Sequence, residues 1–273
     1  MSARTLAAAL LAAALAAPAA QAQIRDVAGF ATTSLGRTDD GTTGPVDVGF
    51  AYNFFGLTGS SLYVSNNGFV SFSTPPSFTP QALAANKIIA AFWADVDTEG
   101  GASGITSYGT GAVDVAGIGT RNAFFVNWPG VGYYNNGTDR LNTFQIFLVD
   151  RNDRGVGDFD FELNYGSMQW EAGSHSNDGG SGGLGNNAEG DKCARAGYSN
   201  GMGTVVELAG SGVCGALIDG GANALAGQRF AYSARSGVVA EVPSATVPEP
   251  STYALMGTGL LGLAGIARRR RSA

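Results

Sequence analysis

Histidine is almost absent from this sequence, and that scarcity excludes the commonest catalytic and zinc-binding sites. The 273 residues include one histidine, His175, and two cysteines, Cys193 and Cys214. A Ser-His-Asp or Cys-His arrangement needs an imidazole that a third group holds in one tautomer. His175 lies in a glycine-rich stretch that offers no such support, so we expect a solvated loop residue. A zinc site built from these three side chains is also excluded if the cysteines are bridged.

Basic side chains are also few, which makes nucleic acid and anionic lipid poor partners. Lysine and arginine total 16 against 22 Asp and Glu, and five of the 16, Arg4 and the four arginines at 268–271, lie near the ends of the chain. Residues 23–250 therefore hold 11 basic and 22 acidic side chains, a net charge of −11. Nucleic acid and anionic membranes select clustered Lys and Arg. Divalent cations and neutral or cationic polymers remain compatible with this charge.

The N-terminal segment has the pattern of a secretory signal peptide. Arg4 is followed by an apolar run over residues 6–17 and by the small-x-small sequence Ala20-Gln21-Ala22. This order predicts a signal peptide over residues 1–22, cleaved between Ala22 and Gln23. In an exported protein we expect Cys193 and Cys214 to form a disulfide, with two unrelated thiols as the alternative.

The C-terminal segment carries a second targeting pattern. Pro248-Glu249-Pro250 precedes 14 uncharged residues at 254–267 and four arginines at 268–271. The run is shorter than the roughly 20 residues that a spanning helix needs, and the arginines favour a cytoplasmic tail. Residues 247–271 closely resemble the bacterial PEP-CTERM sorting signal. The resemblance implies a transmembrane sorting helix inserted transiently in the inner membrane, an exosortase-type processing enzyme and passage to the cell surface; an ordinary C-terminal anchor is the alternative.

Between the two targeting segments the sequence predicts an all-β fold. The 42 glycines disfavour helix interiors and permit tight turns. Residues 158–165 alternate apolar and polar side chains, which indicates a strand with one buried and one wet face. Residues 88–94 form a continuous apolar run typical of a strand buried on both faces, and Asn67-Gly68 favours a type I′ hairpin turn within residues 62–73. Further strand candidates are residues 123–128, 143–149, 205–208 and 229–232.

We therefore expect antiparallel sheets in a sandwich-like arrangement with at most one or two short helices. One such helix is predicted from Thr79-Pro80 to Ala85, with proline at its first position.

Short motifs rich in aromatic and acidic residues in the central region resemble those of the nidogen-like (NIDO) extracellular domain. The motifs are YNFFG at 52–56, LYVSNNGFVSF at 62–72, IAAFWADVD at 89–97, Trp128 with VGYY at 131–134, NTFQ at 142–145, Tyr165 with Gln169-Trp170, and AGY at 196–198. The resemblance implies a β-rich, non-catalytic module of matrix and adhesion proteins. It places the domain at residues 50–235, after an arm with the first strands at 23–49 and before a linker at 236–246.

Carboxylates are the remaining candidates for chemistry, and they occur in two groups. Asp95 and Asp97 are two residues apart on one strand face, and Asp150, Asp153 and Asp158 fall in a stretch with oxygen ligands at alternate positions. That stretch fails as an EF-hand loop, because Arg154 and Phe161 occupy ligand positions. Calcium binding at either group is a hypothesis. For the group at Asp150, Asp153 and Asp158 the alternative is a plain hairpin turn. No other cofactor is expected. A glycoside hydrolase also uses paired carboxylates.

Exposed aromatic side chains could stack on sugars, so their placement matters for function. We expect Trp93, Trp128 and Trp170 to belong to the core, whereas Tyr133 and Tyr134 follow Pro129-Gly130 and are the better binding candidates. The sequence favours a non-catalytic cell-surface or matrix protein whose partners are extracellular polysaccharide or matrix proteins. A secreted glycan-active hydrolase is the alternative.

Overall fold

The computed structural model describes residues 24–76, 82–173, 182–185 and 193–242. The predicted signal peptide, its cleavage site at Ala22 and Gln23, the sorting segment with Pro248-Glu249-Pro250, and His175 lie outside the described residues. Within the described ranges no helix is long and apolar enough to span a membrane.

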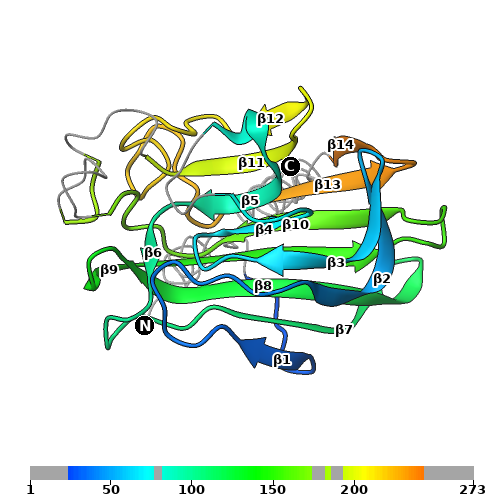
Figure 1. The fold of residues 1–273 in the computed structure, drawn as a ribbon, viewed down its shortest axis with the longest axis horizontal. Coiled ribbons are helices and arrows are strands. Elements are labelled where there is room, and N and C mark those ends of the chain that lie inside the picture. Colours follow the sequence, from blue (N-terminus) through cyan, green and yellow to red (C-terminus); the bar gives the residue numbers. More distant parts are fainter. Residues whose placement is uncertain (1–23, 77–81, 174–181, 186–192, 243–273) are drawn as a thin grey trace, which may run out of the picture. The chain divides into compact units, whose positions relative to one another are not determined.

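The strands of the described residues form two antiparallel sheets, which confirms the all-β prediction (Figure 1). The larger, eight-stranded sheet has the order β1-β7-β8-β9-β10-β13-β14, with β6 paired to β8. Its strands are β1 (Ala31–Ser34), β6 (Val96–Asp97), β7 (Ser107–Val115), β8 (Gly119–Tyr133), β9 (Gly137–Asp150), β10 (Phe159–Tyr165), β13 (Arg229–Arg235) and β14 (Val238–Val242).

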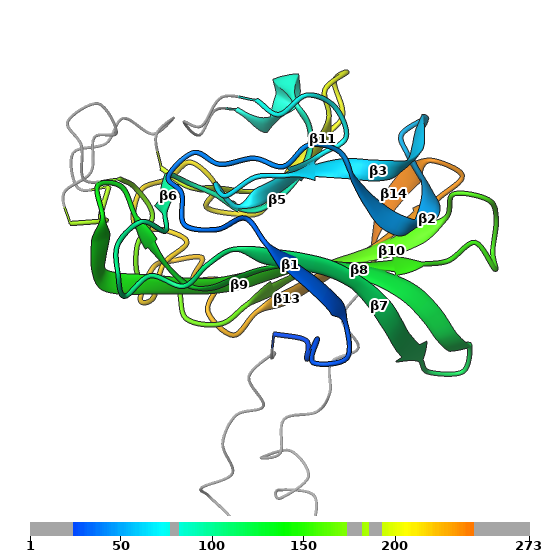
Figure 2. The same ribbon diagram turned by 60° about the horizontal axis from the view of Figure 1, so that its bottom comes forward.

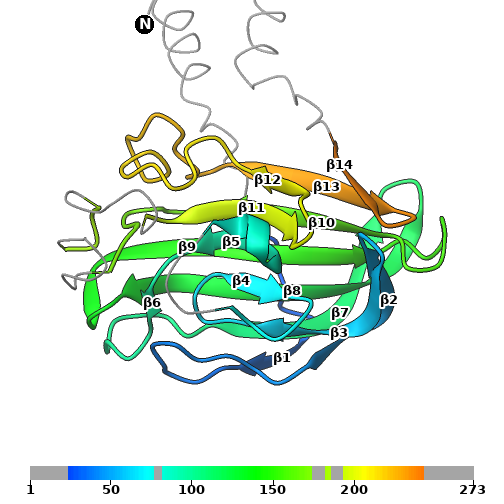
Figure 3. The ribbon, with the colours of Figure 1, turned by 45° about the horizontal axis from the view of Figure 1, so that its top comes forward.

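The smaller, six-stranded sheet has the order β12-β11-β5-β4-β3-β2. Its strands are β2 (Val46–Phe54), β3 (Leu57–Val64), β4 (Phe69–Ser71), β5 (Lys87–Trp93), β11 (Arg195–Asn200) and β12 (Val205–Glu207). Figure 2 shows the sheets as two layers, and in Figure 3 strands β4 and β5 overlie β8 and β9. Tyr198 of β11 packs on Phe161 of β10 and Tyr232 of β13. This is the predicted sandwich.

The core lies between the layers and is rich in aromatic rings. Trp128 of β8 stacks on Phe144 of β9 at a centroid distance of 4.9 Å, and Phe161 of β10 stacks on Tyr232 of β13 at 4.8 Å. A second, smaller apolar cluster joins β4 and β5 to the 3₁₀ helix Leu83–Ala85. Strand β5 is therefore buried on both faces, as its continuous apolar sequence predicted.

The outer face of β10 is less exposed to solvent than its alternating sequence suggested. Phe159, Phe161 and the other apolar side chains point into the core, but the outward Glu162 and Asn164 are only 7% and 0% exposed. Arg25 and Arg229 pair with Glu162, and Asn164 donates to Oε1 of Gln145. The segment at residues 24–30 lies along the outer face of the same sheet, over β8 and β9. Arg25 binds Glu162 through Nε and Nη2, and Phe30 contacts the rings of Phe125 and Phe147.

Three local expectations differ from the structure. The hairpin between β3 and β4 is present, but its turn spans three residues, 66–68, and has a positive φ at Gly68 alone, so the type I′ prediction was wrong. The short helix is a single 3₁₀ turn whose N-cap is Ala82, while Thr79 and Pro80 lie outside the described residues. Residues 238–242, expected within the linker, form β14, because a turn at Ser236-Gly237 folds this valine-rich segment back onto β13.

Candidate functional site

The predicted disulfide is confirmed. Cys193 and Cys214 are bonded with their Cα atoms 5.3 Å apart, and the bridge closes a loop that contains β11 and β12. The carboxylate of Glu171 lies beside this bridge and accepts hydrogen bonds from the backbone N–H groups of Gly185 and Gly215. Burial raises the pKa of Glu171, and the two N–H donors counteract that rise.

The tryptophans belong to the core, as expected. Trp93, Trp128 and Trp170 are fully buried. Trp128 donates its indole N–H to the carbonyl of Asn66, and Trp170 donates to the carbonyl of Val131. Their rings are therefore closed to a ligand.

Tyr133 is not the exposed binding candidate that its position after Pro129-Gly130 suggested. It ends β8, is 3% exposed, packs on Trp170 and donates its hydroxyl to Asp139, whose pKa this bond lowers. The expectation failed because β8 continues through Pro129-Gly130 as an irregular stretch of the ladder rather than ending there. Tyr134, one residue beyond the strand, stays half-buried.

The carboxylates of the turn between β9 and β10 are engaged by different donors. Asp150 accepts from the backbone N–H of Asn152, and Asp158 accepts from that of Ser236. Asp153 pairs with Arg151 and Arg121, and the hydrogen bond from Arg151 lowers its pKa. Guanidinium groups thus take the place that a cation would occupy around Asp153.

Asp97 is likewise committed to local structure. Its two oxygens accept backbone N–H groups from Glu99 and Asn136, each at 2.7 Å, and so fasten the turn after β8 to the end of β6. Asp95, at the entry to β6, is 7% exposed and lies in a different group of carboxylates.

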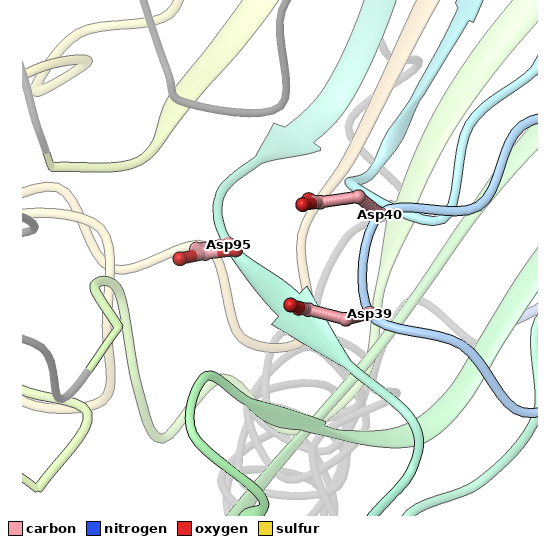
Figure 4. A group of neighbouring side chains, drawn as sticks. All are labelled: Asp39, Asp40 and Asp95. Carbon is pink, nitrogen blue, oxygen red and sulfur yellow. The ribbon is translucent and has the colours of Figure 1, made fainter.

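Asp39, Asp40 and Asp95 are the described carboxylates that could surround one cation. One oxygen from each lies within 4.8 Å of the others, and Figure 4 shows the side chains of Asp39 and Asp40 directed toward the Asp95 residue. Carboxylate oxygens are the usual ligands of calcium, which takes six to eight of them with carbonyls and water completing the shell. Sequence reasoning found Asp95 but missed the other two, because they lie 56 and 55 residues away in the chain; the Asp39-Asp40-Gly41 sequence was the available signal.

The segment that carries Asp39 and Asp40 is held in place by one buried amide. Nδ2 of Asn66 donates to the carbonyls of Thr38, Asp39 and Val96, and its Oδ1 accepts from the hydroxyl of Thr106. The adjacent Asn67 donates from Nδ2 to Asp40 and accepts the N–H of Val96. The Asn-Asn-Gly turn therefore positions both the β1–β2 connection and the start of β6.

Comparison with known proteins covers both regions singled out in the sequence. A family model described as "Nidogen-like domain" matches residues 60–217, and a model described as "PEP-CTERM protein-sorting motif" matches residues 246–271. Human alpha-tectorin is 30% identical over 164 residues, which are 53% of this chain and 7% of that protein, and mouse alpha-tectorin is 31% identical over 166 residues, with the same shares. Nidogen of Drosophila melanogaster is 31% identical over 116 residues, 36% of this chain and 9% of that protein.

The matched region thus spans less than a tenth of the length of these curated relatives. No solved structure matches the chain.

Proposed function

The chain belongs to the nidogen-like domain family, and from that premise we propose that it is an exported bacterial cell-surface protein that binds the polysaccharide or protein components of an extracellular matrix. A domain family of extracellular adhesive and matrix proteins and a sorting signal occur together in this chain. That combination is the observation on which the proposal depends. The proposed place of this role is a polysaccharide-rich envelope or biofilm.

The sorting segment defines the proposed route. Cleavage at Ala22–Gln23 releases the domain outside the inner membrane, and the segment at residues 247–271 holds it there until an exosortase-type enzyme cuts near Pro248-Glu249-Pro250. Five of the chain's 16 basic residues lie in or beside the two targeting segments. The released domain is therefore acidic, which is compatible with neutral polymers and unfavourable for nucleic acid.

The structure supports a binding role through the stiffness of the domain. Two sheets joined by an aromatic core, a disulfide and many backbone contacts present a preformed surface, and a preformed surface loses little conformational entropy on binding. The calcium hypothesis belongs to the same proposal: an ion at Asp95, with Asp39 and Asp40 as neighbours, would further fix the connection between β1 and β2.

The mass of the exported product tests the proposal most directly. We expect a protein that starts at Gln23, lacks the residues after the Pro248-Glu249-Pro250 motif, contains one disulfide and is recovered from the surface or matrix fraction. A matched variant truncated after residue 246 should be exported but lost to the medium. Recovery of the intact 273-residue chain from the cytosol would overturn the proposal.

A glycan-active hydrolase is the second candidate. It is distinguished by incubating the exported protein with surface polysaccharide and measuring both retention and new reducing ends. Retention without new reducing ends supports the binding role, and turnover supports the hydrolase.

A further inference from the structure

The connection between β1 and β2 borders an open cleft that none of the predicted site residues lines. The cleft lies between Ser34 and Leu35 at the end of β1, Thr38 and residues 41–46 leading into β2, and Tyr108 of β7. Its volume is about 320 Å³. That is the lower end of the roughly 300–1,000 Å³ typical of small-molecule sites, a size suited to a short stretch of an extended polymer.

Both walls of the cleft are fixed to the sheets by backbone hydrogen bonds. On one side the N–H of Leu35 donates to the carbonyl of Thr106 at 3.0 Å. On the other, Thr43 and Val64 exchange two bonds, Thr43 N–H to the Val64 carbonyl and Val64 N–H to Thr43 Oγ1, both at 2.9 Å. The N–H of Asn66 donates to the carbonyl of Gly41 at 2.8 Å. The cleft is therefore preformed.

The lining is uncharged and rich in hydroxyl groups. Its side-chain hydroxyls belong to Ser34, Thr38, Thr42, Thr43 and Tyr108, and no Asp, Glu, Lys, Arg or His lines it. Thr43 uses its oxygen within the fold, but no hydrogen bond among the described residues involves the hydroxyls of Ser34, Thr42 or Tyr108. Each of these three can both donate and accept a hydrogen bond.

Tyr108 adds an aromatic surface of fixed orientation. Its ring is half-buried and packs against Phe124 of β8 at a centroid distance of 6.5 Å. A tyrosine held in this way offers an apolar ring and a polar tip to the same ligand. Hydroxyl groups and a face of C–H groups are the two surfaces of a pyranose ring.

We propose that this cleft binds a neutral sugar unit of an extracellular polysaccharide, with Tyr108 under the ring and the hydroxyls of Ser34 and Thr42 bonding its edge. The inference rests on the proposed matrix role and names the ligand class for it. The charge of the protein favours a neutral polymer over an anionic one. No cationic side chain lines the cleft, and residues 23–250 carry a net charge of −11, so an anionic polysaccharide is disfavoured.

Affinity electrophoresis of the mature exported protein tests the cleft. The gels contain dextran, laminarin or galactomannan as neutral polymers, or alginate as an anionic one. We expect retardation by at least one neutral polymer and none by alginate. Tyr108→Ala should raise the dissociation constant about three- to tenfold, and Thr42→Val, which keeps the side-chain shape, about threefold.

Two matched variants separate the cleft from general effects. Tyr63→Ala removes another half-buried tyrosine, and Thr58→Val removes an exposed threonine hydroxyl; both residues are on β3 and neither lines the cleft. We expect both to bind as the unmodified protein does. Melting curves by circular dichroism identify any variant that has lost its fold.

The inference is overturned if no neutral polymer retards the protein, if alginate alone does, or if folded Tyr108→Ala and Thr42→Val bind normally. Failure of this kind leaves the proposed matrix role intact if the protein is still recovered from the matrix fraction. Failure of the matrix role shows separately, as protein recovered from the cytosol.

Discussion

Trp128 and Asn66 are joined across the two sheets: the indole N–H of Trp128 on β8 donates to the carbonyl of Asn66, in the turn after β3, at 2.7 Å. Both residues are fully buried. This bond ties the centre of the larger sheet to the turn that positions the β1–β2 connection. The cleft and the three clustered aspartates both depend on that connection.

Trp128→Phe should lower the free energy of unfolding by about 1–3 kcal/mol, because it leaves the buried Asn66 carbonyl without its donor. Urea unfolding followed by circular dichroism measures the change. Tyr63→Phe, which removes a hydroxyl from a half-buried ring, is the control and should stay within about 0.5 kcal/mol. A Trp128→Phe variant as stable as this control would show that the bond between the sheets contributes little.

Gly68 and Gly56 form a matched pair for substitution by alanine, since their φ angles are +86° and +85°. At Gly68 a Cβ would lie 1.9 Å from the carbonyl oxygen of Phe92, whereas at Gly56 nothing lies within 4 Å. We expect Gly56→Ala to cost about 1–2 kcal/mol from backbone strain alone. Gly68→Ala should cost more than about 4 kcal/mol or prevent folding. Equal costs in thermal unfolding would contradict the close approach of the turn to β5.

The unfolding free energy should depend on the charge of Glu162. Burial opposes its ionisation, but the guanidinium groups of Arg25 and Arg229 outweigh burial and hold its pKa below the usual 4.5. Because the folded-state pKa is the lower one, the stabilisation is complete above the unfolded-state value and is lost as the pH falls through the folded-state value.

Glu162→Gln should therefore reduce stability at pH 7 by about 2 kcal/mol, between the values for exposed and buried ion pairs. The difference from the unmodified protein should shrink below about pH 4.5. Urea titrations at a series of pH values measure it. A difference that is the same at pH 7 and pH 3 would mean that the variant acts through packing rather than charge.

Loss of the Cys193–Cys214 disulfide should reduce stability by about 3 kcal/mol, as expected for a closed loop of roughly 20 residues. The double variant Cys193→Ser, Cys214→Ser and the reduced unmodified protein should agree. Alkylation in denaturant, followed by mass spectrometry, should label two thiols after reduction and none before it. Labelling without reductant would contradict the bridge.

Calcium should raise the melting temperature if the carboxylates of Asp39, Asp40 and Asp95 hold an ion. A calcium concentration of about 100 times the dissociation constant adds about 2.7 kcal/mol, and a domain of this size gains roughly 2–4 °C per kcal/mol. Asp40→Asn should remove the response, and Asp219→Asn, an exposed aspartate outside the group, should retain it. An unchanged melting temperature between millimolar calcium and chelator would end the calcium hypothesis. Loss of the response in Asp153→Asn instead would move the ion to the turn between β9 and β10.

Much of the molecule follows from local sequence. Alternation in β10, the apolar run of β5 and the abundance of glycine are consequences of side-chain period and backbone freedom, so strands and fold class were predictable. Export also made the disulfide predictable from two cysteines. The two targeting patterns are linear signals, which need no fold to be read.

Tertiary structure alone decided which side chains contact one another and which strand faces are exposed to solvent. Glu162 on the outward face of β10 is buried because Arg25 and Arg229 bind it, and Tyr133 is buried because β8 runs on past a proline and a glycine. Asp95 lies beside Asp39 and Asp40 because one buried asparagine binds the β1–β2 connection to β6. These relationships join residues far apart in the chain, and only packing of the two sheets sets the distances between them.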